Sequence, residues 1–224
     1  MTRVKSFFFT LILSLIYYVP MAQKKTTFLA LGDSYTIGES VEEAQRWPVQ
    51  LVKKLNQEGS NIERPHIVAK TGWTTDELLG GLDTATIARS YDLVSLLIGV
   101  NNQYRGYDFE QYEKEFNSLL EQALALAKND PGKVFVVSIP DYGVTPFASE
   151  KDPAKIAEEL DSYNAYAAKV CQEKDIKYFN ITSISRQAVN ERNLIASDDL
   201  HPSGKMYERW VELMIPWFRK EWSK

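Results

Sequence analysis

The stretch Leu31-Gly32-Asp33-Ser34-Tyr35-Thr36-Ile37-Gly38 decides the fold, because an apolar, β-rich run over 26–31 ends there in small and polar residues. Glycine at position 32 permits the backbone angles of a tight strand exit. Ser34 is then expected at the carboxyl end of a strand, where open α/β sheets bind their ligands. A Gly-Asp-Ser turn is also typical of an ordinary strand-to-helix cap, so other parts of the chain must decide between the two interpretations.

Outward from this stretch, short β-rich runs alternate with longer segments of helical period. That alternation predicts an α/β fold, a parallel sheet with helices on both faces. Five strands are usual for a flavodoxin-like sheet. The expected strands are 26–31, 62–69, 93–98, 134–139 and 176–179, and the expected helices are 44–56, 75–82, 109–128, 153–174 and 203–222. Pro216 falls inside the last helix, and we expect it to bend that helix or end it early.

The first 22 residues differ from the rest of the chain. Arg3 and Lys5 precede an uncharged apolar run over 7–19, which is typical of a secretory signal peptide. The run is shorter than the roughly 17 to 25 residues of a membrane span, although an uncleaved N-terminal anchor remains an alternative. We therefore expect a signal peptide over 1–22, a secreted or periplasmic protein, and no membrane span after cleavage.

Composition limits what the mature chain can do. A total of 224 residues with 44% hydrophobic content suits one α/β domain, which we expect over 23–224. A net charge of -4 without a basic stripe argues against a nucleic-acid binder. The single cysteine, Cys171, lies at helical spacing with apolar residues and is expected to be buried. With His66 and His201 as the only histidines, the chain has no Cys/His cluster, and we expect neither a metal nor a cofactor.

Several expected strands end in polar loops that carry residues suited to acyl transfer. A serine hydroxyl such as Ser34 needs an imidazole to take its proton, and the imidazole needs a carboxylate to fix its tautomer. Asp198 and His201 are close enough in sequence to meet within one turn of chain. The developing oxyanion needs donors, which the backbone N–H groups of Ser34 and Gly72 and the side-chain amide of Asn101 can supply. These groups converge if the segment around His201 crosses the carboxyl edge of the sheet.

In this order, Gly32-Asp33-Ser34, Gly72, Gly99-Val100-Asn101 and Asp198-x-x-His201 resemble the four sequence blocks of the SGNH hydrolases, also called GDSL esterases/lipases. The resemblance implies a three-layer α/β/α sandwich. It further implies that Ser34 is the nucleophile, His201 the general base and acid, and Asp198 the residue that orients His201. By the same resemblance, Ser34, Gly72 and Asn101 form the oxyanion hole.

The chain departs from the family pattern at two positions. Tyr35 stands where many members have leucine, which puts little in doubt, and Asn102 stands where the third block often has aspartate. The oxyanion donor Asn101 is retained, while the support of its loop is expected to differ. Asp199 competes with Asp198 as the triad acid, and the Asp-x-x-His spacing favours Asp198.

We therefore expect an exported serine esterase that hydrolyses carboxylic esters through an acyl-enzyme, with a glycan or other small ester as its substrate. Deacetylation of a carbohydrate is favoured, because export and short loops suit a small acyl group on a larger exposed substrate. The alternatives are a lysophospholipase- or thioesterase-like lipid hydrolase and a non-catalytic glycan-binding module. The residues expected to line the substrate opening are Trp73, Asn102, Tyr104 and Tyr142. The sequence does not indicate an oligomeric state.

Overall fold

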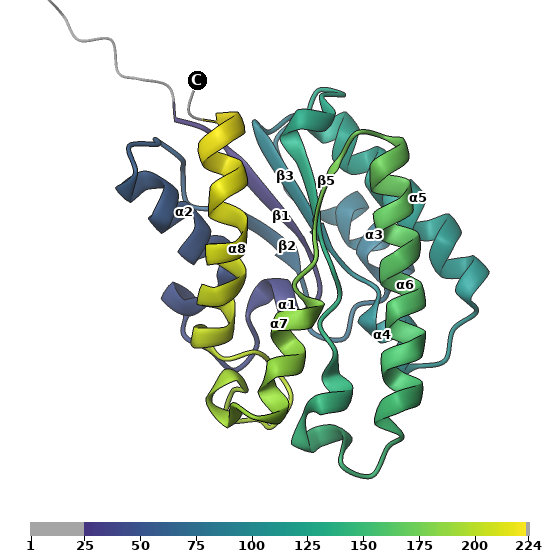
Figure 1. The fold of residues 1–224 in the computed structure, drawn as a ribbon. Helices are drawn as coiled ribbons and strands as arrows, with labels where there is room; N and C mark the ends of the chain where they lie inside the picture. The colour runs from purple at the N-terminus through teal and green to yellow at the C-terminus, as the bar shows by residue number, and fades with distance from the viewer. Residues whose placement is uncertain (1–24, 223–224) are drawn as a thin grey trace, which may run out of the picture.

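The computed structural model describes residues 25–222, so the expected signal peptide lies outside the described residues. Five parallel strands form one sheet in the order β2-β1-β3-β4-β5. The strands are β1 (Phe28–Gly32), β2 (His66–Ala69), β3 (Leu93–Leu97), β4 (Val134–Val137) and β5 (Lys177–Phe179). The α/β sandwich with a five-stranded parallel sheet is confirmed (Figure 1).

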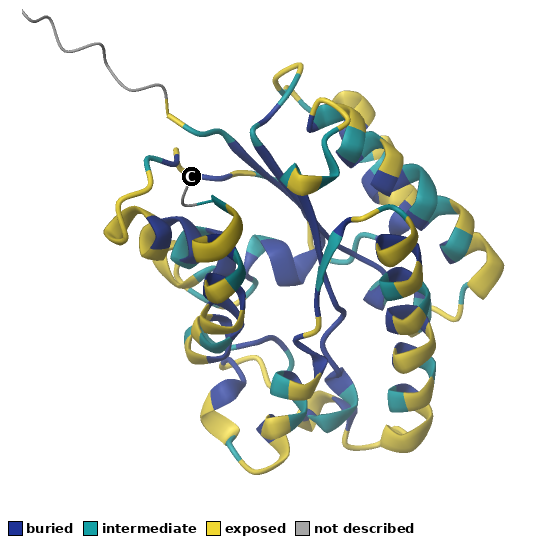
Figure 2. Ribbon diagram, turned by 45° about the horizontal axis from the view of Figure 1, so that its top comes forward, coloured by how far each residue is buried: buried dark blue, intermediate teal, exposed yellow. Residues whose placement is uncertain are grey.

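Helices cover both faces of the sheet (Figure 1). On one face lie α2 (Trp47–Gln57) and α8 (Gly204–Trp222), and on the other lie α3 (Thr75–Thr84), α5 (Phe109–Leu126) and α6 (Pro153–Glu173). Each long helix buries one apolar stripe, which on α5 consists of Tyr112, Phe116, Leu119, Leu120 and Ala123. The central strands β1, β3 and β4 are buried along their whole length, as Figure 2 shows. Cys171 is fully buried, as expected.

The structure shortens the second expected strand. Only His66–Ala69 pair with β1, while Ile62 makes an isolated parallel bridge to Thr26. Pro65 separates these two contacts, and proline has no N–H to donate to the sheet. Because β2 is an edge strand, His66 is exposed, and its Nδ1 contacts the Tyr91 hydroxyl at 2.8 Å.

Two expected helices differ from their predicted form. The segment 44–56 divides into a short turn, Glu43–Gln45, and α2, because Arg46 is extended and Pro48 lies in the first turn of the new helix. Pro216 does not end α8, which continues to Trp222. Pro216 faces solvent, where the carbonyl that loses its helical partner can be hydrated. None of the helices among residues 25–222 is both long and apolar enough to span a membrane.

Because all five strands are parallel, their carboxyl ends share one edge. Two short helices begin there, α1 (Ser34–Ile37) after β1 and α4 (Val100–Tyr104) after β3. A third, α7 (Thr182–Ser185), follows β5. The fold thus brings segments that are distant in sequence to one rim.

Candidate active site

A pocket of about 150 Å³ lies at this rim, next to the carboxyl ends of β1 and β3. It is lined by Ser34 and Tyr35 of α1, by Thr71 and Gly72 after β2, by Val100, Asn101 and Tyr104 of α4, by Tyr142 and Phe147 after β4, and by Leu200 and His201. Ser34 and His201, which come from opposite ends of the chain, therefore share one pocket.

Ser34 is held at the base of the pocket by its neighbours. It is the first residue of α1, and the Asp33 carboxylate caps this helix by accepting a hydrogen bond from the Tyr35 N–H at 3.0 Å. Gly32 is needed for space rather than for its backbone angles, because a Cβ there would collide with the Thr36 hydroxyl and the Leu97 carbonyl. Ser34 is only 5% exposed, so its hydroxyl is accessible mainly through the pocket.

Asp33, which directly precedes Ser34, is fully buried. Its Oδ1 accepts the Tyr35 N–H, while its Oδ2 has no hydrogen-bond partner among the described residues. Burial raises the pKa of the Asp33 carboxyl to about 7, against the opposing effect of the backbone hydrogen bond. Asp33 is therefore easier to protonate than an ordinary aspartate.

The three expected oxyanion donors lie around the same opening. Gly72 has a φ of 84°, a left-handed conformation that favours glycine, and its carbonyl accepts a hydrogen bond from Arg105 at 2.6 Å. The side-chain amide of Asn101 donates to the Trp73 carbonyl at 2.9 Å. An amide nitrogen carries two hydrogens, so this bond fixes the orientation of Asn101 and leaves a second donor.

His201 and Asp198 form a close pair. The Nδ1 of His201 lies 2.6 Å from Asp198 Oδ2, and the His201 backbone N–H donates to Asp198 Oδ1 at 2.9 Å. The other ring nitrogen, Nε2, makes none of the hydrogen bonds found among residues 25–222, and His201 lines the pocket. The Tyr35 ring packs edge-on against the imidazole, with ring centroids 5.7 Å apart.

Ser40 completes the surroundings of Asp198. Its hydroxyl donates at 2.6 Å to Asp198 Oδ2, the oxygen that also contacts His201. Burial alone would raise the pKa of Asp198, but the hydrogen bonds from Ser40, from His201 and from the Leu200 N–H outweigh it and hold that pKa well below its usual value. Asp198 is thus charged at neutral pH.

The loop that carries this pair is closed by backbone contacts. The Ala196 N–H donates to the His201 carbonyl at 2.7 Å, and the Ser203 N–H donates to the Leu194 carbonyl at 2.8 Å. Asp199, the competing acid, forms an ion pair with Arg192 instead. The acid and the base therefore belong to one compact loop before α8.

Two of the expected substrate-lining residues do not reach the pocket. Asn102 is fully buried; its Oδ1 accepts the Thr75 N–H at 3.0 Å and its amide donates to the Thr75 hydroxyl at 2.7 Å. Asn102 thereby joins α4 to α3, which corrects the expectation of a substrate contact. The Trp73 ring packs against Gly81 of α3 instead. Tyr104 and Tyr142 do line the pocket.

Ser40, Phe147 and Leu200 are among the side chains at the site that the sequence did not indicate. Ser40 belongs to no sequence motif, and only the fold brings it into contact with Asp198. Phe147, which is 42% exposed, and Leu200 form part of the pocket wall. The small residues and proline around Phe147 indicate a loop, but nothing in the sequence indicates which way the loop turns.

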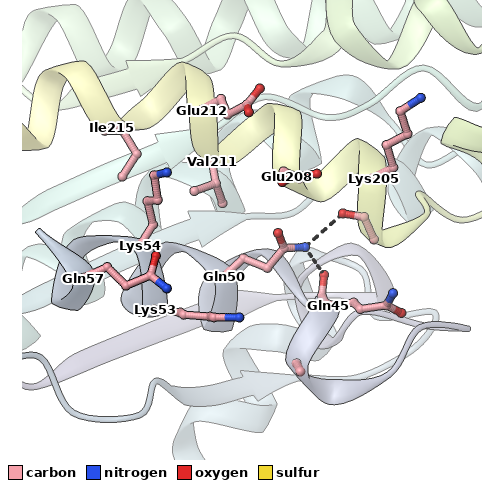
Figure 3. A pocket seen from close by; sticks show the side chains of 12 residues that line it. Gln45, Gln50, Lys53, Lys54, Gln57, Lys205, Glu208, Val211, Glu212 and Ile215 are labelled. Carbon is pink, nitrogen blue, oxygen red and sulfur yellow. Dashed lines mark hydrogen bonds between the residues drawn. The ribbon is translucent and has the colours of Figure 1, made fainter.

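A larger hollow of about 490 Å³ lies elsewhere, between α2 and α8 (Figure 3). Its lining contains lysine, glutamine and glutamate side chains, and it includes neither a serine nor a histidine. Gln50 crosses it, donating to the Gln45 carbonyl at 2.6 Å and the Gly204 carbonyl at 2.9 Å. These bonds join the start of α8 to α2 and to the turn before it. The contacts at this hollow therefore hold the two helices together.

Comparison with protein families gives one match over most of the chain. The model of the GDSL-like lipase/acylhydrolase family matches residues 30–209, a range that includes Ser34, Gly72, Asn101, Asp198 and His201. A comparison with curated proteins found no match.

Solved structures with the same fold are similar over nearly their whole length. TesA is 19% identical, with 87% of this chain and 99% of that chain covered and a TM-score of 0.68. The psychrotrophic esterase EstA from Pseudoalteromonas sp. is 18% identical, with coverage of 89% and 100% and a TM-score of 0.65. Axe2, an acetyl xylan esterase from Geobacillus stearothermophilus, is 20% identical, with coverage of 88% and 94% and a TM-score of 0.62. At these identities, the likeness shows the shared fold.

Proposed function

The chain belongs to the GDSL-like lipase/acylhydrolase family and is an ester-bond hydrolase, and we propose that it is an exported serine esterase that removes small acyl groups, foremost acetyl, from carbohydrates. One observation supports the catalytic part of this proposal most strongly. Ser34 and His201 line the same pocket, and the ring of His201 is hydrogen-bonded to a charged Asp198. Export rests on the sequence of residues 1–22 alone.

In the proposed mechanism, His201 Nε2 takes the proton of Ser34 as the serine Oγ attacks the ester carbonyl carbon. The C–O bond to the alcohol then breaks, and His201 gives the proton to the departing oxygen. Water attacks the acyl-enzyme in the same manner, with His201 again as the base, which releases the acid and restores Ser34. Acylation of Ser34 and hydrolysis of the acyl-enzyme, two easier steps, thereby replace the direct attack of water on the ester.

Polar groups around the pocket would stabilise the charges that develop during these steps. The backbone N–H groups of Ser34 and Gly72 and the free hydrogen of the Asn101 amide would donate to the oxyanion. Asp198 would hold the imidazole in one tautomer and offset its positive charge. Ser40 would act as a positioning residue, because its hydroxyl contacts the same carboxylate oxygen as the ring.

A small acyl group fits the size and lining of the pocket. A volume of about 150 Å³ is well below the roughly 300 to 1,000 Å³ of sites that enclose drug-sized ligands. The lining includes the apolar side chains of Val100, Tyr142, Phe147 and Leu200, which are available to contact a methyl group. The similarity of the fold to an acetyl xylan esterase is consistent with this choice.

The proposal is tested by Ser34→Ala with p-nitrophenyl acetate as substrate. We expect kcat to fall roughly 10⁴- to 10⁶-fold, because the nucleophile is removed. Ser162→Ala is the matched control, since Ser162 lies exposed on α6 and, among residues 25–222, its hydroxyl donates only to the Glu158 carbonyl. Wild-type turnover in Ser34→Ala would refute the serine mechanism, whereas no turnover by the wild type itself would favour a binding module of the same fold.

A lipid hydrolase is the second candidate, and the exposed aromatic rim favours it. Tyr104 and Phe147 are 46% and 42% exposed at the pocket mouth, where a longer acyl chain could lie across them. A series of p-nitrophenyl esters of increasing chain length separates the two candidates. We expect the highest kcat/KM for the acetyl ester, and a maximum at eight or more carbons would favour the lipid substrate.

A further inference from the structure

A hollow of about 460 Å³, distinct from the one between α2 and α8, adjoins the proposed catalytic pocket and shares Tyr104 and Tyr142 with it. Its other walls come from the end of α4 and the start of α6. We define the α4–α6 basin by Gln103, Arg105, Lys151, Lys155 and Glu159, which line it. Because two residues border both hollows, a substrate held at Ser34 can extend past Tyr104 into the basin.

The basin contains three basic side chains and two carboxylates, Asp152 and Glu159. Asp152 caps α6 by accepting hydrogen bonds from the Ala154 and Lys155 N–H groups. Glu159 accepts a hydrogen bond from Gln103 at 2.7 Å and lies 3.7 Å from the Lys155 ammonium. Both acidic groups therefore already have partners within the chain.

Lys151 differs from the other two cations of the basin. Arg105 contacts the Gly72 carbonyl and Glu77, and Lys155 contacts Glu159. Among residues 25–222, no carboxylate lies within ion-pair distance of Lys151, whose ammonium instead lies 4.9 Å from the centroid of the Tyr104 ring. The basin thus offers one positive charge that has no ionic partner, in a chain whose net charge is -4.

Tyr104 forms the divide between the two hollows. Its ring packs against Tyr142 at 5.9 Å and against Phe147 at 6.0 Å, and it remains 46% exposed. An aromatic ring held in this way can support the apolar face of a sugar, while polar groups beside it bind the hydroxyls. The Lys151 ammonium lies over this ring, so a sugar that contacts Tyr104 would also meet the positive charge.

We propose that the α4–α6 basin binds the alcohol part of the substrate, and that this part is a sugar unit bearing a carboxylate. The substrate class is then an O-acetylated acidic glycan. This inference rests on the proposed esterase function, because the small pocket must hold the acetyl group for the alcohol to lie in the basin. The polar, cationic lining of the basin does not suit an acyl chain.

The test compares acetylated xylo-oligosaccharides with and without a glucuronate side group. The measured quantity is the ratio of kcat/KM for the acidic substrate to kcat/KM for the neutral one, at low ionic strength. We expect a wild-type ratio of about two to five, the effect of one ion pair that is partly exposed, and a smaller ratio as salt is added. Lys151→Glu replaces attraction by repulsion and should lower the ratio to about one or less.

Lys169→Glu is the matched control. Lys169 lies on α6 but outside the basin, it is exposed, and its substitution makes the same change in net charge. We expect it to keep the wild-type ratio. A wild-type ratio of one or below, or an equal loss in Lys169→Glu and Lys151→Glu, would overturn the acidic-glycan inference. If p-nitrophenyl acetate is also not hydrolysed, both this inference and the esterase proposal fail, whereas Ser34-dependent turnover with a ratio of one overturns this inference alone.

Discussion

Asp33 and Asp198 are chemically identical side chains next to two residues of one small pocket, Ser34 and His201, and their environments shift their pKa values in opposite directions. Asp33 is fully buried with one oxygen unpaired among the described residues, and burial raises its pKa to about 7. Asp198 lies in an exposed loop, where hydrogen bonds from Ser40 and from the His201 loop lower its pKa well below the usual value. Solvation and hydrogen-bond donors decide these pKa values more than the residue type does.

The contrast separates two tasks within the site. The carboxyl of Asp33 caps α1 and supports the backbone that carries Ser34, a task that does not need a charge. Asp198 orients a ring that becomes positively charged in the proposed reaction, a task that does need one. Three substitutions test whether this division is correct.

Asp198→Asn should give the largest effect. We expect kcat to fall roughly 10²- to 10⁴-fold, because an amide cannot offset the charge of the imidazolium and favours the wrong tautomer. Steady-state kinetics with p-nitrophenyl acetate measures the loss. Asp199→Asn is the control one residue away, since Asp199 pairs with Arg192 rather than His201. A similar loss in both variants would contradict the assignment of Asp198 as the orienting acid.

Asp33→Asn should instead change stability in a pH-dependent way. The folded-state pKa of Asp33 is raised above the ordinary 3.8, so its stabilising effect is complete below pH 4 and is lost as the pH rises through about 7. Asparagine does not titrate, so the stability of the variant relative to wild type should increase by roughly 2 to 4 kcal/mol between pH 4 and pH 8. Urea unfolding at the two pH values measures this change.

Asp92→Asn provides the control of opposite sign. The pKa of Asp92 is lowered, since hydrogen bonds from Thr27 and Lys128 outweigh its partial burial. The stabilising effect of Asp92 is therefore already present at pH 4 and is lost only as the pH falls further, so the stability of Asp92→Asn relative to wild type should change little between pH 4 and pH 8 and should rise below pH 4. A pH-independent difference for Asp33→Asn would show that the buried carboxyl stays charged in the folded protein.

Ser40→Ala should give the smallest effect. Removing the hydrogen bond to Asp198 Oδ2 should lower kcat by about three- to tenfold, in line with the net value of a typical hydrogen bond at a solvent-exposed position. Ser40 has a φ of 62°, so Ser40→Gly relieves backbone strain while also removing the hydroxyl. We expect Ser40→Gly to be more stable than Ser40→Ala in thermal unfolding and yet equally slow. A wild-type kcat in Ser40→Gly would show that the Ser40 hydroxyl does not contribute to catalysis and that only the backbone conformation at this position matters.

Much of the fold could be predicted from the sequence, because strands buried on both faces require continuous apolar runs. The runs before Gly32 and Gly99 are of this kind, and both became central strands. The edge strand β2 was predicted too long, since the partly exposed segment before His66 has a weaker hydrophobic pattern. The break at Arg46 depends on Pro48, because proline favours the first turn of a helix over its interior.

The site was predictable wherever a residue acts within its own loop. Asp198 and His201 are three positions apart and meet as their spacing suggests. Asn102 was misjudged because a polar residue after a strand can turn inward as readily as outward, and only the position of Thr75 decides which. Ser40 could not be predicted, since its contact with Asp198 depends on how two distant loops pack.

The closed loop that carries Asp198 and His201 links the proposed acid and base to a single opening event. If the Ala196 and Ser203 backbone bonds break together, both groups leave the rim, while Ser34 stays fixed on its buried strand exit. Heating should therefore inactivate the enzyme reversibly before the sheet unfolds, because Ser34 keeps its position while His201 moves away from it.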